Sequence, residues 1–201
     1  MFHLFKFLNH NTTYMKSLLQ KLLNTNPFLL FSPFLFLFIL IVLKTHADRM
    51  DGDEARYVNF AEHLLNGYYS TAAPNINLWN GPGYPIFLMP FIGLQLPLIL
   101  ITLMNAVMQY FSIVLLYFAI LKFTNQTKAI LFSLFWACYY IAYQEMGQIL
   151  TEDLSNFLIT LILFFIAKMF EAESRQKMYT ILTGITLGFL VLTKIIFGYV
   201  L

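Results

Sequence analysis

Long apolar stretches separated by short polar ones dominate this chain. A helix that crosses a bilayer needs about 20 mainly apolar residues, and five stretches approach or exceed that length. The five predicted spans cover about residues 27–43, 96–121, 129–143, 154–169 and 178–201. We therefore expect an all-α, polytopic membrane protein with about five transmembrane helices.

The largest segment outside these spans, residues 44–95, carries a second kind of pattern. From Glu54 onward, apolar residues recur at helical spacing, namely at Tyr57, Phe60, Ala61, Leu64 and Leu65. Asp53 precedes this stripe as a predicted N-cap, and Gly67 follows it as a predicted stop. The pattern predicts an amphipathic helix on the membrane surface, with acidic residues at its start. Gly81-Pro82-Gly83 then predicts a rigid turn that leads back into the membrane.

The composition agrees with a membrane protein and excludes several other classes. Hydrophobic residues make up 59% of the 201 residues and charged ones 11%, whereas soluble domains have about 45–50% and about 25%. Such a chain is not a soluble enzyme. The single cysteine, Cys138, excludes an internal disulfide and a cysteine-based zinc site. A net charge of +2 gives no reason to expect a nucleic-acid partner.

The basic residues indicate how the chain is oriented. The leader, residues 1–26, holds three lysines and no acid, and the loops 122–128 and 168–177 are also basic. The positive-inside rule places these segments in the cytoplasm and the segment 44–95 outside. The first stretch is predicted to be an uncleaved anchor, because it and its polar leader are longer than in a signal peptide. Since the last stretch reaches Leu201 without a polar end, we expect the chain to be the N-terminal part of a longer protein.

Several charged residues are candidates for chemistry, and each has a simpler explanation. Asp53 and Glu54 form a functional site or only complement a helix N-terminus, and the same holds for Glu152 and Asp153 at the start of the fourth span. Lys194 lies in the fifth span, where it either meets a ligand or extends to the membrane surface. His46 and His63 share no metal-ligand spacing and are predicted to be surface residues.

Four blocks together resemble one enzyme family. Residues 53–57, Asp-Glu-Ala-Arg-Tyr, resemble the Asp-Glu-x-x-Tyr motif of GT-C glycosyltransferases, close to the protein O-mannosyltransferases and lipid A aminoarabinose transferases. Residues 81–88, Gly-Pro-Gly-Tyr-Pro-Ile-Phe-Leu, resemble the next block of that family. Residues 150–154 and 184–194 match its later blocks, the last with a Gly-x-x-x-Gly pair that predicts a close helix–helix contact. Their order and spacing cover about residues 28–201.

The resemblance implies a function and a set of roles. Such enzymes take a sugar from a polyprenyl-phosphate donor and pass it to a lipid, glycan or protein acceptor by an inverting displacement on the outer face of the membrane. Asp53 is then the general base, and Glu54 tunes it or contacts the acceptor. Arg56 either holds the carboxylates or a phosphate, or forms only a surface ion pair. The other expected donor-binding residues are Tyr57, Tyr84, Glu152, Asp153 and Lys194.

The resemblance also implies a location and leaves two points open. We expect an integral protein of the bacterial cytoplasmic membrane, with a GT-C-like domain over residues 27–201 and an outer catalytic loop over residues 44–95. A charged residue of the family is replaced by Asn80-Gly81, so a divalent metal and no cofactor remain as alternatives. The alternatives to an enzyme are a non-catalytic membrane module and a transporter-type segment. Acids that cluster outside the spans argue against a transporter.

Overall fold

The computed structural model describes residues 24–78, 80–171 and 173–199, so most of the basic leader lies outside it. The described residues form α-helices and short 3-10 helices and contain no strand, which confirms the all-α prediction. The α-helices of the described residues are α2 (Pro27–Thr45), α3 (Asp53–Leu65), α4 (Gly83–Gly93), α5 (Ile99–Phe123), α6 (Gln126–Ala137), α7 (Glu152–Met169) and α8 (Gln176–Thr193). The 3-10 helices are η1 (Tyr140–Ala142), η2 (Glu173–Arg175) and η3 (Ile195–Tyr199).

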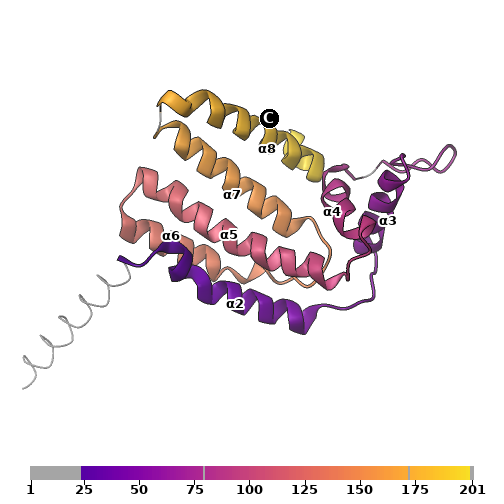
Figure 1. The fold of residues 1–201 in the computed structure, drawn as a ribbon, viewed down its shortest axis with the longest axis horizontal. Coiled ribbons are helices and arrows are strands. Elements are labelled where there is room, and N and C mark those ends of the chain that lie inside the picture. The colour runs from indigo at the N-terminus through magenta and orange to yellow at the C-terminus, as the bar shows by residue number, and fades with distance from the viewer. Residues whose placement is uncertain (1–23, 79, 172, 200–201) are drawn as a thin grey trace, which may run out of the picture.

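The helices α2, α5, α6, α7 and α8 lie side by side as a bundle, and α3 and α4 cover one end of it (Figure 1). Helix α5 packs against α2, α6 and α7, and α7 packs against α8. The start of α7 and the last turn of α8 meet α3 and α4 at that end (Figure 1). We call it the α3–α4 end. The basic connections α5–α6 and α7–α8 lie at the opposite end.

Two apolar clusters hold the bundle together. Phe31 and Phe38 of α2 pack with Ile113 of α5 in the first cluster, which also takes in α6. The second cluster joins α3, α4, α5, α7 and α8, with Tyr84 and Leu190 among its buried members. The α3–α4 end is therefore continuous with the core of the bundle, which gives its polar side chains a fixed support.

Two helices, α2 and α5, are long and apolar enough to cross a membrane. The predicted third span, residues 129–143, does not form as one helix: α6 ends at Ala137, and η1 follows it. Its 12 residues extend about 18 Å at 1.5 Å per residue, against about 30 Å of hydrocarbon. Tyr139, Tyr140 and Tyr143 follow the end of α6. Helix α7 carries three charged residues, Glu152, Asp153 and Lys168.

The predicted amphipathic helix is confirmed as α3, with two differences. Gly52 at φ 58° is its N-cap, and Asp53 is its first residue, so the prediction of an Asp53 cap is wrong. Its buried stripe includes Val58 besides the predicted Tyr57, Phe60 and Ala61. The predicted stop is confirmed, since Gly67 follows the C-cap with φ 85°, a conformation that suits glycine.

The segment after Gly81-Pro82 holds a helix that the sequence pattern did not predict. Helix α4 begins at Gly83, and Pro85 lies in its first turn, where the missing N–H costs no hydrogen bond. The predicted contact at Gly184 and Gly188 is wrong within this chain: a Cβ at either position would meet no atom within 4 Å. The close approach is made instead by Gly83, where a Cβ would lie 2.5 Å from Thr193 N of α8.

Candidate functional site

The residues that the sequence singled out come from four elements that meet at the α3–α4 end. Asp53 and Glu54 lie in the first turn of α3, and Glu152 and Asp153 lie in the first turn of α7. Tyr84 belongs to α4, and Lys194 directly follows α8. The structure thus gathers side chains that are up to about 140 positions apart in sequence.

A pair of buried tyrosines stands at the centre of this arrangement. The rings of Tyr57 and Tyr84 meet edge to face with centroids 5.0 Å apart, and the Tyr57 hydroxyl accepts a hydrogen bond of 3.1 Å from Asn80 Nδ2. Burial raises the pKa of Tyr57, and its contact with the Thr151 hydroxyl opposes that rise. Burial also raises the pKa of Tyr84 well above its ordinary value, and nearby carboxylates, Asp153 foremost, add to the effect.

Asp53 is the exposed carboxylate of the group. Its side chain is 56% accessible, and its Oδ1 is bonded to Arg56 Nη2 one turn further along α3. Because Asp53 binds Arg56, it does not cap the helix. The ion pair that was one of the two alternatives for Arg56 is therefore present, and the carboxylate remains open to a molecule from solvent.

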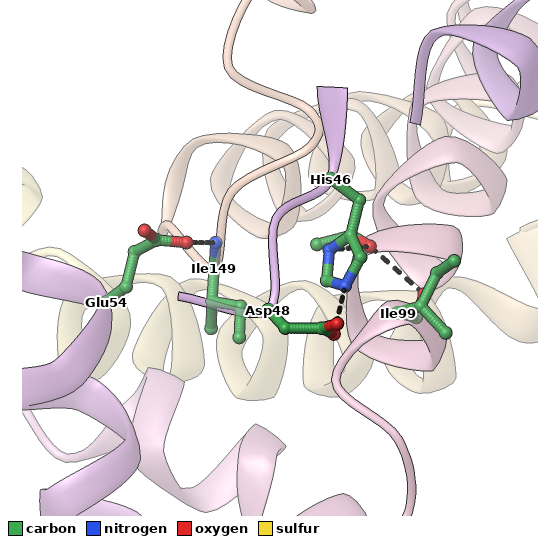
Figure 2. Close-up of polar contacts among 6 residues, drawn as sticks. His46, Asp48, Glu54, Ile99 and Ile149 are labelled. Carbon is green, nitrogen blue, oxygen red and sulfur yellow. Dashed lines mark hydrogen bonds and ion pairs between the residues drawn. The ribbon is translucent and has the colours of Figure 1, made fainter. Parts of the chain in front are cut away.

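Glu54 faces inward and connects two elements. Its Oε1 accepts a 2.8 Å hydrogen bond from the backbone N–H of Ile149 (Figure 2). This bond ties α3 to the segment that leads into α7. His46, predicted to be a surface residue, is half-buried at the end of α2, with Nδ1 3.2 Å from Thr102 Oγ1 and Nε2 3.4 Å from Asp48 (Figure 2).

Glu152 and Lys194 form an ion pair between α7 and the end of α8, with 2.9 Å from Oε1 to Nζ. Lys194 is the C-cap of α8, and η3 continues from there, so the predicted unbroken fifth span of residues 178–201 is wrong. Both side chains of the pair are partly exposed, Lys194 at 38% and Glu152 at 45%. Gly83 lets α4 approach Thr193, the neighbour of Lys194, so the position of this lysine is held by close packing.

Asp153 differs from Glu152 although the two are adjacent. It is 4% exposed and lies before the apolar stretch that begins at Leu154. Burial raises the pKa of Asp153 to about 8, and the charges of Glu152 and Glu145 add to the rise. Asp153 is therefore mostly protonated at neutral pH, and its Oδ1 has no hydrogen-bond partner among the residues described. This makes it a neutral buried group, unlike the charged Glu152.

A cavity of about 540 Å³ opens beside the Glu152–Lys194 pair. Apolar side chains from α7, η1 and η3 form much of its wall, including Ile141, Ile159 and Phe197. Two polar atoms of the wall, Trp136 Nε1 and Ser155 Oγ, are buried and make no hydrogen bond within the described part of the chain. The cavity therefore combines an apolar wall, a charge pair and two unused hydrogen-bond donors.

Trp136 and Ser155 were missed by sequence reasoning, although one signal was present. Glu152, Ser155 and Ile159 follow each other at intervals of three and four residues, which places them on one face of α7. Asp53 and Arg56 do not line this cavity. No group of three or more His, Cys, Asp or Glu side chains suited to a metal ion occurs within residues 24–78, 80–171 and 173–199.

Comparison of the chain with known protein families, with curated proteins and with solved structures finds no match to any of them.

Proposed function

We propose that this chain is a membrane glycosyltransferase of the GT-C type. It moves a sugar from a polyprenyl-phosphate donor to an acceptor on the outer face of the membrane. The observation that carries the proposal is the 540 Å³ cavity, whose apolar wall bears the Glu152–Lys194 pair. A phosphate attached to a long hydrocarbon chain needs both a cation and an apolar surface.

The cavity offers a distinct partner to each part of such a donor. The hydrocarbon chain lies along Ile159 and Phe197, and the phosphate approaches Lys194 Nζ. The indole N–H of Trp136 and the hydroxyl of Ser155 supply neutral donors to the phosphate oxygens. Unused buried donors are costly, by about 1–3 kcal/mol each, so a ligand that accepts their hydrogen bonds gains affinity.

The chemistry is a single displacement with Asp53 as the general base. Asp53 takes the proton of an acceptor hydroxyl, and the oxygen attacks the anomeric carbon of the donor sugar. The bond between that carbon and the phosphate oxygen breaks, and polyprenyl phosphate leaves with the electron pair. Lys194 stabilises the charge on the leaving phosphate, and Arg56 holds Asp53 in position. Glu54, bonded to Ile149 N, is a positioning residue rather than a second base.

The proposal includes five membrane crossings, with the N-terminus in the cytoplasm of a bacterial cell; the third crossing combines α6 with the chain up to η1, because α6 alone is too short. Besides α2 and α5, the helices α6, α7 and α8 expose large apolar side chains, among them Phe135 at 72% and Ile185 at 65%. A soluble protein rarely exposes so many. The basic connections lie at the end of the bundle opposite α3 and α4 (Figure 1), as the positive-inside rule requires for an outward-facing site.

The proposal is tested by transfer of radiolabelled sugar from a panel of polyprenyl-phosphate donors in membranes that contain the protein. Wild type is compared with Lys194→Gln and with the control Lys177→Gln, which removes an exposed lysine at the other end of α8. We expect Lys194→Gln to reduce transfer at least tenfold and the control to match wild type. Equal transfer by Lys194→Gln would refute the role of the cavity. Lack of transfer by wild type from every donor would favour the non-catalytic membrane module.

A further inference from the structure

A second cavity, of about 360 Å³, shares no lining residue with the first one. It lies between α3 and the segment 71–77, which follows α3 in the chain, and it is open to solvent. The described residues that line it are Gly52, Ala55, Arg56, Asn59, Phe60, His63, Thr71, Asn75 and Asn77. Its size is at the lower end of the range for small-molecule sites, which spans about 300–1,000 Å³.

Arg56 connects this cavity to the proposed base. Its Nη2 is bonded to Asp53 Oδ1, while its Nε is buried and has no hydrogen-bond partner among the described residues. Arg56 lines the cavity and is bonded to Asp53, so a hydroxyl group bound beside Arg56 lies next to the carboxylate that would accept its proton. The Arg56 side chain, 36% exposed, thus contacts both the base and the cavity.

The chemistry of the wall favours a neutral ligand with several hydroxyl groups. The amide of Asn59 both donates and accepts hydrogen bonds. The Thr71 hydroxyl donates to the backbone carbonyl of Asn75 and keeps its acceptor capacity, and His63 Nδ1 lies 3.3 Å from the Tyr69 carbonyl, which leaves Nε2 for a ligand. The charge of Arg56 is offset by Asp53, and no acid lines the cavity in the described part of the chain. A phosphate or carboxylate would find no unpaired cation here, and an apolar chain would find only Phe60 to pack against.

The wall is held in place before any ligand binds. The Tyr69 hydroxyl donates a 2.6 Å hydrogen bond to the backbone carbonyl of Asn80, and its ring stacks on Phe60 with centroids 4.7 Å apart. At the end of the segment 71–77, the Asn77 N–H donates a 2.7 Å hydrogen bond to Oγ of Ser70, the residue just before the segment. A site whose walls are fixed loses less conformational entropy on binding.

We infer that this cavity is the acceptor site and that the acceptor is the hydroxyl of a neutral sugar residue, so that the enzyme extends a glycan. The inference rests on the proposed function, because it assigns the acceptor of that same reaction. The cavity accommodates one sugar ring, whose hydroxyl groups bind the amide and hydroxyl side chains, and the reacting hydroxyl points along Arg56 to Asp53. The volume of about 360 Å³ favours a single sugar ring over a longer peptide segment.

The test uses the full chain in detergent micelles and a panel of neutral methyl glycosides, with serine- and threonine-containing peptides as the competing class. Binding is followed by saturation-transfer NMR and transfer by radiolabelled product. We expect a methyl glycoside to give saturable signals with wild type and Asn59→Ala to raise its half-saturation concentration at least fivefold. Glu62→Ala, an exposed change on the same helix outside the cavity, should match wild type.

The two readouts separate the failure of this inference from the failure of the proposed function. Glycoside binding that depends on Asn59 supports the acceptor site, even where no donor yields product. The lack of product would then count only against the proposed glycosyltransferase activity. Sugar transfer to peptides but not to glycosides would overturn the inference and leave the glycosyltransferase standing. Equal glycoside binding by wild type and Asn59→Ala would also overturn it.

Discussion

Replacing the buried acid Asp153 with asparagine should remove a pH dependence of stability. Asp153 ionises at an ordinary pKa of 3.8 in the unfolded chain, whereas burial raises its pKa to about 8 in the folded protein. Between these values the folded state holds a proton that the unfolded state has lost. The contribution of this group to stability is therefore full below about pH 4 and is lost as the pH rises through about 8.

The size of the effect follows from the shift. Each pKa unit corresponds to about 1.4 kcal/mol, so raising the pH from 5 to 7 should lower the free energy of unfolding on the order of 3 kcal/mol through Asp153 alone. For a chain of this length, 1 kcal/mol changes Tm by about 2–4 °C. Wild type should then lose about 6–12 °C between these pH values, and Asp153→Asn, which stays neutral, should lose much less.

The assay is thermal unfolding in detergent micelles at a series of pH values. Asp51→Asn is the matched control, because the Asp51 side chain is 77% exposed and pairs only with the exposed Arg49. This variant should keep the wild-type slope. If Asp153→Asn shows the same loss of Tm between pH 5 and 7 as wild type, Asp153 is not the protonated buried acid described above.

Three further predictions concern packing, a positioning contact and orientation. Gly83→Ala should lower stability by about 1–3 kcal/mol, because its Cβ would lie 2.5 Å from Thr193 N. The control Gly184→Ala, with open space around it, should leave Tm unchanged or raised. Equal effects of the two substitutions on Tm would contradict the packing of α4 against α8. Glu54→Ala should lower stability by about 1–3 kcal/mol, because it leaves the backbone N–H of Ile149 unpaired. The control Glu62→Ala should keep the wild-type stability. Equal Tm values for Glu54→Ala and Glu62→Ala would refute the contact. An impermeant maleimide should label the exposed Cys138 in intact spheroplasts. In a Cys138→Ser background, Lys128→Cys should react only after the membrane is permeabilised. The reverse labelling pattern would contradict the proposed orientation in the membrane.

The sequence predicted the helical class and the existence of α3 because these rest on strong local patterns. The stripe from Tyr57 to Ala61 gave the buried face of α3, and Gly67 gave its end. The helix lengths were less predictable. The apolar stretch around α6 is interrupted by the tyrosines that follow Ala137, and composition averaged over a window does not register such a break.

The residues of the site were predictable, but their pairings were not. Asp53 and Arg56 are one turn apart on α3, so their ion pair was foreseeable as one of two alternatives. The pair between Glu152 and Lys194 joins residues 42 positions apart, and only tertiary packing sets their distance of 2.9 Å. The difference between Glu152 and its neighbour Asp153 likewise depends on burial, since Asp153 is 4% exposed whereas the Glu152 side chain is 45% exposed.

The role of Asp53 is the central claim, and one comparison tests it most directly. Sugar transfer from the most active polyprenyl-phosphate donor is measured for wild type, Asp53→Asn and Asp51→Asn at equal amounts of inserted protein. A general base contributes roughly 10²–10⁴-fold to the rate, so Asp53→Asn should lose at least a hundredfold and Asp51→Asn should match wild type. Transfer by Asp53→Asn at the wild-type rate would contradict the account.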